Sequence, residues 1–290
     1  MKPAQFEYIR AKSVADAITA LSTYEGDARI IAGGQSLAPM LHMRLIQPTA
    51  IVDINHIDGL DSISGLDEST VIGATCRYST LEGSLLIAKR LPLLQQALRY
   101  VGDRQVRNRG TLIGSLVQAD PLSEASLVSL VLDATVVVQG PSGTREIGIE
   151  DFIEGPYSTA LESDEMVIEV IFPLASKTHA FFEVGRRHND YAVLAIAISA
   201  ECATDGLWRR LRLGMIGAEE NAILIHEAGE IINGSTLDDI TIERAVAATL
   251  EVVDPPSDAR GTADYRRHII GVHVRRLLSQ IRYEQVALRG

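Results

Sequence analysis

Apolar residues near the start of the chain follow first a helical and then a strand-like spacing. Residues 13–21 have apolar side chains on one helical face behind Ser13, a typical N-cap residue. Short β-type runs follow at 29–32 and 50–54, with a short apolar helix expected at 37–45. The pattern therefore predicts a small α/β subdomain over residues 1–56, in which two glycines follow the first strand.

A second subdomain, residues 57–175, is expected from the next group of apolar segments. Residues 85–100 have helical spacing, but Pro92 lacks a backbone N–H and should divide this helix in two. Residues 101–109 are polar and arginine-rich, so we interpret them as a loop. The remaining apolar runs of this subdomain are 71–74, 110–116, 126–132, 134–139 and 166–172.

The composition becomes polar at residue 176, and we place the start of a C-terminal α+β domain, 176–290, there. Two strands are expected at 192–202 and 211–216, then helices at 223–232 and 241–252. A long terminal helix at 262–287 should bury a stripe of Ile269, Val272, Leu277 and Ile281. Its arginines are interpreted as a basic, solvent-exposed face, and they are Arg266, Arg267, Arg275 and Arg276.

Composition and charge narrow the functional classes. The chain has 290 residues, of which 46% are hydrophobic, and a formal net charge of −11, which argues against a nucleic-acid binder. No apolar run is long enough for a transmembrane helix, and the N-terminus does not have the pattern of a secretory signal. Cys76 and Cys202 lie far apart without CxxC spacing, and the histidines form no HxH or HExxH pair. We therefore expect a cytoplasmic protein without a metal site of its own.

Two glycine-containing segments are candidate ligand loops: AGGQS at 32–36 and GTLIGS at 110–115. A diphosphate requires several backbone N–H donors around one concavity, and glycine lets a ligand approach the main chain. Ser36, Thr111 and Ser115 add short hydroxyl side chains. Neither segment has the GxGxxG or GxxxxGK[ST] spacing of a nucleotide fingerprint. From the residues alone, ordinary tight turns explain the two segments equally well.

Four longer stretches, in order, carry a resemblance to a known family. They are FEYIRAKSVADAITAL continuing to ARIIAGGQSLAPMLHMRLIQPTAIVDI, then QVRNRGTLIGSLVQADPLSE, then FFEVGRRHNDYAVLAIAI, and finally PPSDARGTADYRRHIIGVHVRRLL. Together they span residues 6–278. The chain resembles the FAD-binding medium subunit of the molybdenum hydroxylases, the group of carbon monoxide dehydrogenase, quinoline oxidoreductase and xanthine dehydrogenase.

The resemblance implies an α+β fold. It consists of a two-subdomain FAD-binding domain of the vanillyl-alcohol-oxidase/molybdopterin-dehydrogenase type and a C-terminal domain of the flavoprotein type. In this family two glycine loops hold the FAD diphosphate through main-chain N–H groups. The implied contacts are Ile30, Ile31, Ala32, Gly33, Gly34, Gln35, Ser36 and Leu37 in the first loop, and Thr111, Leu112, Ile113, Gly114 and Ser115 in the second.

Ile113 departs from the family pattern, which has glycine at its position. A β-branched side chain resists a positive φ and blocks close approach of a ligand. Either the second loop bends differently in this chain or FAD is held less tightly.

Further contacts implied by the resemblance lie outside the loops. Asp120 belongs to a matching Asp-Pro turn, and Glu124 is placed to accept a hydrogen bond from a ribose or ribityl hydroxyl, although a solvated acid at a helix start is an equal alternative. Val167 matches a strand at the flavin edge, with core packing as the alternative. Tyr191 matches an aromatic residue near the flavin ring. The alternative is that the segment 186–191 forms a solvated turn with local ion pairs. Arginines near the second loop could bind diphosphate or an acidic partner, or lie in solvent; they are Arg104, Arg107 and Arg109.

No set of catalytic residues is evident in the sequence. The resemblance accounts for this, because it implies that the substrate reacts at the molybdenum cofactor of a partner subunit. The resemblance implies an FAD-carrying electron-transfer subunit. Its partners would be a large molybdenum-cofactor subunit and a small subunit with [2Fe–2S] clusters, assembled as a dimer of heterotrimers with an external electron acceptor. Two alternatives remain: a stand-alone FAD oxidoreductase, with His188 as a candidate base, and a flavin-less scaffold in which Ile113 closes the diphosphate site.

Overall fold

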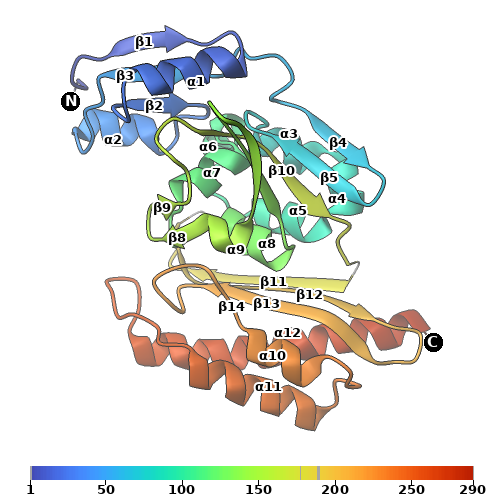
Figure 1. The fold of residues 1–290 in the computed structure, drawn as a ribbon. Helices are drawn as coiled ribbons and strands as arrows, with labels where there is room; N and C mark the ends of the chain where they lie inside the picture. The colour runs from blue at the N-terminus through green and yellow to red at the C-terminus, as the bar shows by residue number, and fades with distance from the viewer. Residues whose placement is uncertain (1, 177, 188–189, 290) are drawn as a thin grey trace. The chain divides into compact units, whose positions relative to one another are not determined.

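The structure, a computed structural model, describes residues 2–176, 178–187 and 190–289. The chain forms two compact units, each built from discontinuous segments (Figure 1). The first unit comprises Met1–Ser84, Asp103–Ala119 and Ala134–Pro173, and the second comprises Leu85–Gly102, Asp120–Asp133 and Leu174–Gly290.

The first unit begins with a parallel three-stranded sheet in the order β1 (Glu7–Arg10), β3 (Ala50–Asp53), β2 (Ala28–Ile31). The predicted first helix is α1 (Val14–Thr23), whose N-cap Ser13 accepts a hydrogen bond from the backbone N–H of Asp16. Helix α2 (Leu37–Met43) joins β2 to β3. These elements match the helices and strands predicted within residues 1–56 and place the AGGQS segment between β2 and α2. Strand β1 was not predicted, since its EYIR sequence is mostly exposed.

An antiparallel five-stranded sheet completes the strand framework of the first unit. Its order is β4 (Ile63–Leu66), β5 (Ser69–Gly73), β10 (Met166–Pro173), β6 (Thr135–Gly140), β7 (Gly143–Gly148). A short hairpin of β8 (Ile153–Gly155) and β9 (Ser158–Thr159) follows α9 (Ile149–Phe152). The predicted strands at 71–74, 134–139 and 166–172 are confirmed as β5, β6 and β10.

The segment around the second glycine loop differs from the prediction. Residues 104–109 form helix α6 (Arg104–Arg109) rather than a loop, because the Asp103 side chain caps it by accepting from the Val106 N–H at 2.8 Å. Helix α7 (Leu112–Gln118) follows immediately, and α3 (Tyr78–Gly83) packs against α6. The GTLIGS segment therefore connects two helices and does not follow a strand.

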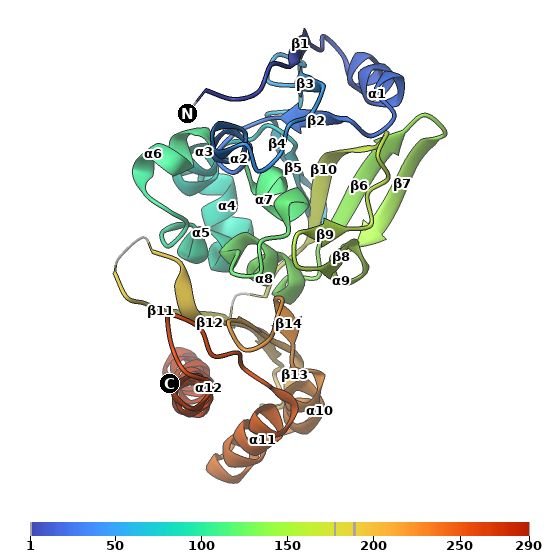
Figure 2. The ribbon, with the colours of Figure 1, turned by 90° about the vertical axis from the view of Figure 1, so that its left-hand side faces the viewer.

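The second unit is organised around an antiparallel sheet in the order β11 (Thr178–Gly185), β12 (Ala192–Cys202), β13 (Trp208–Ile216), β14 (Ile223–Leu224). Helices from the middle of the chain contact one face of this sheet; they are α5 (Pro92–Leu98), with the short α4 (Leu85–Arg90) before it, and α8 (Glu124–Val131). Helices from the end of the chain pack on the other face (Figure 2): α10 (His226–Ile232), α11 (Asp239–Val252) and α12 (Ala263–Arg289).

The burial of strand β12 reflects its position in a sheet with helices on both faces. Its residues 192–200 are all buried, as expected for a central strand covered on both faces. The large side chains of Leu194, Ile196 and Ile198 belong to the apolar cluster shared with α10, α11 and α12. Alternation of side chains then leaves Ala195 and Ala197 for the opposite face, and these small residues leave room for α8.

Several predictions for the second unit need correction. The break at Pro92 is confirmed, since α5 begins there, but residues 223–224 are strand β14 and β11 was not predicted. In α12 the fully buried stripe is Ile270, Val274, Leu278 and Ile281, whereas Val272 is only half-buried. Arg266, interpreted as exposed, is 1% exposed.

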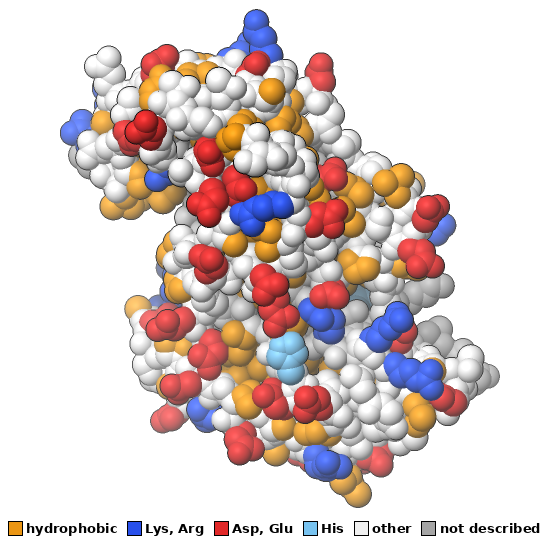
Figure 3. All heavy atoms as spheres, in the orientation of Figure 1, with side chains coloured by type: hydrophobic (Ala, Val, Ile, Leu, Met, Phe, Trp, Pro, Cys, Tyr) orange, Lys and Arg blue, Asp and Glu red, His pale blue; other side chains and the backbone are white. Residues whose placement is uncertain are grey.

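Acidic side chains are spread over the face of the molecule that Figure 3 displays, in keeping with the net charge of −11. Within residues 2–176, 178–187 and 190–289, no helix combines the length and apolar character needed to cross a membrane.

Candidate cofactor-binding site

The first glycine loop leaves backbone donors available for a ligand. Gly34 has a φ of +70°, a conformation that favours glycine. Ser36 occupies the N-cap position of α2, but its side chain makes no capping hydrogen bond. Among the hydrogen bonds of the described residues, none is donated by the backbone N–H groups of Gly34, Gln35 or Ser36. Since unpaired N–H groups favour an anion, this loop is suited to a phosphate.

The second loop is a helix start. Thr111 caps α7 by accepting from the Gly114 N–H at 3.0 Å, and Gly110 accepts from the Tyr78 N–H at 3.0 Å. Ile113 lies in the first turn of α7 without a positive φ, and its side chain is buried at 4% exposure. Ile113 therefore does not adopt the positive φ that a β-branched side chain resists, because the second loop bends into a helix at this position.

The two loops touch each other at Gly33. A Cβ atom on Gly33 would lie 2.4 Å from the carbonyl oxygen of Arg109 and 2.8 Å from the Cα of Gly110. Both obstacles are backbone atoms, which cannot move aside as a flexible side chain can. Only glycine fits at this position, and the approach brings the two loops together within the first unit.

A network of polar side chains connects the two loops near this contact. The Asn55 side chain donates to the Ala32 carbonyl at 2.9 Å and to the Asp53 carboxylate at 2.7 Å. Its oxygen accepts from the Arg77 guanidinium, which also donates to the carbonyl of Arg109. Asn55 thus reaches the first loop and Arg77 the second.

The pKa values of the Asp53 carboxyl and the Arg77 guanidinium both lie below the ordinary values of these groups. Burial opposes ionisation of Asp53, but hydrogen bonds from Tyr8 and Asn55 outweigh it and hold its pKa below the ordinary value. Burial lowers the pKa of Arg77, and the neighbouring Arg109 cation lowers it further. The network therefore contains a charged carboxylate near two arginines.

These features fit a diphosphate. Unpaired N–H groups in the first loop, a close approach that excludes any Cβ and two nearby guanidinium groups together match the requirements of an extended dianion. The other predicted contacts of the first unit lie around this cradle: Ile30 and Ile31 in β2, Leu37 at the start of α2 and Ser115 in α7. Val167 is buried at 4% exposure in β10 and contributes to core packing.

In the second unit, Glu124 forms part of a half-buried acidic pair. Glu124 is the first residue of α8, but it is half-buried rather than solvated, and burial raises its pKa to about 7. Asp120 precedes it and accepts from the Leu122 N–H at 2.9 Å. On β11, burial and then the Glu124 charge raise the pKa of Glu183 to about 8, and one Glu183 carboxylate oxygen has no hydrogen-bond partner among the described residues.

The strand register explains why these two acids meet. Glu183 pairs with Ala195, so its side chain lies on the small-residue face of the sheet, where α8 packs. Phe181, two residues earlier on the same face, contacts Tyr100 with ring centroids 5.1 Å apart. Glu183 had no sequence signal, because its partner lies 59 residues away in the chain.

We expect this acidic pair to make stability pH-dependent. The folded-state pKa of Glu183, about 8, exceeds its ordinary 4.5, so its contribution is complete below about pH 4.5 and is lost as pH rises through about 8. Glu183→Gln should therefore leave the free energy of unfolding little changed at pH 5 and raise it by about 1–2 kcal/mol at pH 9. Urea unfolding of the full chain at pH 5, 7 and 9 measures this.

Glu230→Gln is the matched control, since Glu230 is exposed on α10. Its unfolding curves should follow the wild type at each pH. A Glu183→Gln variant that is less stable than the wild type at pH 9 would contradict the raised pKa of Glu183.

Tyr191 lies beside a loop tied down by a buried arginine. Its ring is 54% exposed, and the Arg260 guanidinium lies 5.2 Å from the ring centroid. Asp258 accepts from the backbone N–H groups of Arg260 and Gly261 and pairs with Arg266 at 2.8 Å. This loop therefore places Arg260 over Tyr191. His188, the candidate base, lies outside the described residues.

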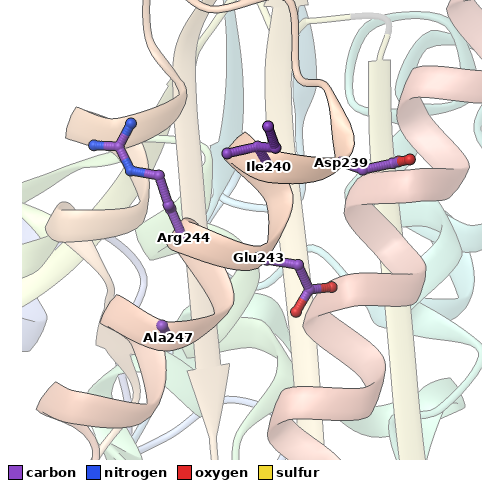
Figure 4. A pocket seen from close by; sticks show the side chains of 5 residues that line it. All are labelled: Asp239, Ile240, Glu243, Arg244 and Ala247. Carbon is purple, nitrogen blue, oxygen red and sulfur yellow. The ribbon is translucent and has the colours of Figure 1, made fainter.

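A hollow beside α11 is a weaker candidate for a ligand site (Figure 4). It is lined by Asp239, Ile240, Glu243, Arg244 and Ala247. All five of these lining residues belong to α11. Asp239 and Glu243 already pair with Arg282 and Arg275 of α12. Among the described residues, no group of three or more His, Cys, Asp or Glu side chains is arranged to hold a metal ion.

Comparisons with known proteins identify the family of the chain. Residues 4–175 match the family model described as the FAD-binding domain in molybdopterin dehydrogenase, and residues 179–281 match the CO dehydrogenase flavoprotein C-terminal domain. The chain is 37% identical over 282 residues to the 6-hydroxypseudooxynicotine dehydrogenase complex subunit alpha of Paenarthrobacter nicotinovorans, covering 97% of this chain and 95% of the relative. It is 32% identical to the carbon monoxide dehydrogenase medium chain of Afipia carboxidovorans, covering 97% and 98%.

Solved structures give the same result. A carbon monoxide dehydrogenase from Hydrogenophaga pseudoflava matches with a TM-score of 0.92 and 32% identity, over 96% of this chain and 98% of the other. Quinoline 2-oxidoreductase from Pseudomonas putida 86 matches with a TM-score of 0.92 and 32% identity, over 98% and 99%. The α+β fold predicted from the sequence is confirmed.

Proposed function

We propose that this chain, which belongs to the family of FAD-binding subunits of the molybdenum hydroxylases, transfers electrons within a heteromeric complex. It would take them from [2Fe–2S] clusters of a partner subunit and pass them to an external acceptor. The observation that supports this most strongly is the two-loop cradle at Gly33, which suits a dinucleotide diphosphate. Bound FAD supplies the redox chemistry.

The residues of the first unit would hold the diphosphate end of FAD. The backbone N–H groups of Gly34, Gln35 and Ser36 would donate to its oxygens, and the start of α7 at residues 111–115 would close the opposite side. The contacts expected of Asp120, Glu124, Val167 and Tyr191 stay predictions. So does the domain boundary at residue 175.

The partners would be a large subunit with a molybdopterin-type cofactor and a small iron–sulfur subunit, assembled as a dimer of heterotrimers. Relatives support the partner kinds, since they are named as medium chains and as a subunit of a dehydrogenase complex. The cytoplasm is the proposed location. The free thiols of Cys76 and Cys202 support it, because a reducing compartment keeps cysteines unpaired.

Native purification with cofactor analysis tests this proposal. We expect the chain to co-purify with two other polypeptides, and the complex to contain molybdenum, iron and FAD. The isolated full chain should bind FAD, and substrates of the complex should not bleach that flavin in the absence of the partners. Bleaching by substrate in the isolated chain would instead indicate a stand-alone oxidoreductase, and a colourless complex would indicate a scaffold.

A further inference from the structure

Arg77 links the two loops of the cradle and has no assigned role. It is the residue before α3, and its guanidinium donates to two acceptors on different segments. One is the Arg109 carbonyl, at the point where Gly33 meets the second loop, and the other is the Asn55 side-chain oxygen. Asn55 in turn donates to the Ala32 carbonyl of the first loop at 2.9 Å.

The bonding of Arg77 leaves its charge without a carboxylate partner. In the described part of the chain, Arg77 forms no ion pair, and both of its acceptors are neutral oxygens. Asp53 attracts Arg77 electrostatically without pairing with it directly, and Asn55 hydrogen-bonds to both side chains. Arg109 adds a second cation nearby, and the two guanidinium groups repel each other. An anion bound between the two loops would offset this repulsion and accept hydrogen bonds in the place of water.

The planar fork of arginine suits this position. Two N–H groups point in fixed directions, so one side chain can hold an amide oxygen and a main-chain carbonyl at once. A lysine ammonium is a point charge on a flexible stem and does not impose that geometry. Removing the fork would let Asn55 and the Arg109 carbonyl move independently, and the spacing of the two loops would no longer be fixed.

We propose that Arg77 is the positioning residue of the diphosphate cradle, and that it holds the two loops at the spacing of an FAD diphosphate through Asn55 and the Arg109 carbonyl. This inference rests on the proposed function, since it takes FAD as the ligand. It predicts that Arg77 and Asn55 strengthen binding of the diphosphate part of the cofactor and not binding of the flavin ring.

The test compares FAD with riboflavin, which has the same ring and no phosphate. Dissociation constants are measured by flavin fluorescence on flavin-free full-length wild type, Arg77→Gln, Arg77→Lys and Asn55→Ala. We expect Arg77→Gln to weaken FAD binding about 10- to 100-fold, while riboflavin binding changes by less than about threefold. Arg77→Lys should regain only part of the loss. Asn55→Ala, which leaves Arg77 in place, should show the same selective weakening.

Arg99→Gln is the control for charge, because Arg99 is exposed at the end of α5. It should bind both flavins as the wild type does. Unchanged FAD affinity in Arg77→Gln, or an equal loss for FAD and riboflavin, would overturn the inference. If Arg77→Gln does not fold, Asn55→Ala decides by the same criterion. A wild-type chain that binds no FAD would instead refute the proposed function.

Discussion

Gly33→Ala is expected to abolish detectable FAD binding by the full chain at micromolar cofactor. The added Cβ would lie 2.4 Å from the Arg109 carbonyl oxygen and 2.8 Å from the Gly110 Cα, so the two loops must separate. Displacing packed backbone is as costly as severe overpacking of a core, about 3 kcal/mol, and that energy lowers FAD affinity roughly a hundredfold or more. Flavin absorbance of the purified protein and an FAD titration measure the effect.

Gly83→Ala is the matched control. Gly83 is exposed in α3, and its new Cβ would meet nothing within 4 Å. This variant should retain wild-type flavin content. Normal FAD affinity in Gly33→Ala would show that the contact between the loops does not shape the cofactor site.

Arg266→Met should lower the free energy of unfolding by about 3 kcal/mol, since it removes a fully buried, bonded guanidinium. Arg266 is 1% exposed and donates to the Gly217 carbonyl at 3.1 Å and to Asp258 at 2.8 Å. The variant would leave that carbonyl unpaired and release the loop that holds Arg260 over Tyr191. Urea unfolding measures the change in stability.

Arg276→Met provides the comparison on the same helix. Arg276 is exposed, so its replacement should change the free energy of unfolding by less than about 0.5 kcal/mol. Equal stability of the two variants would show that the buried ion pair contributes nothing beyond a surface contact.

The sequence predicts those elements whose local pattern agrees with their tertiary role. Helix α1 has its cap and amphipathic face within a few residues, and β12 is an uninterrupted apolar run. Strand β1 and helix α6 were missed because their residues are polar and mostly exposed, so tertiary pairing and the Asp103 cap determine them. Arg266 was misassigned because burial of an arginine depends on Asp258 and Gly217, which a helical pattern does not reveal.

The candidate site, like the fold, was only partly predictable from the sequence. Glycine spacing and the resemblance indicate both loops from the sequence alone. The contact at Gly33 and the link through Asn55 and Arg77 depend on segments 22 to 76 residues apart in the chain, which have no local signature. Ile113 was judged by the conformation of a loop, whereas the structure places it in a helix, where its side chain packs inward.

The central claim is that this chain carries FAD in the cradle around Gly33. Equilibrium titration of the flavin-free full chain with FAD tests it most directly. We predict saturation at one FAD per chain, with inorganic diphosphate competing for the site. A chain that binds no FAD, or binds it equally well in the presence of saturating diphosphate, would contradict the claim.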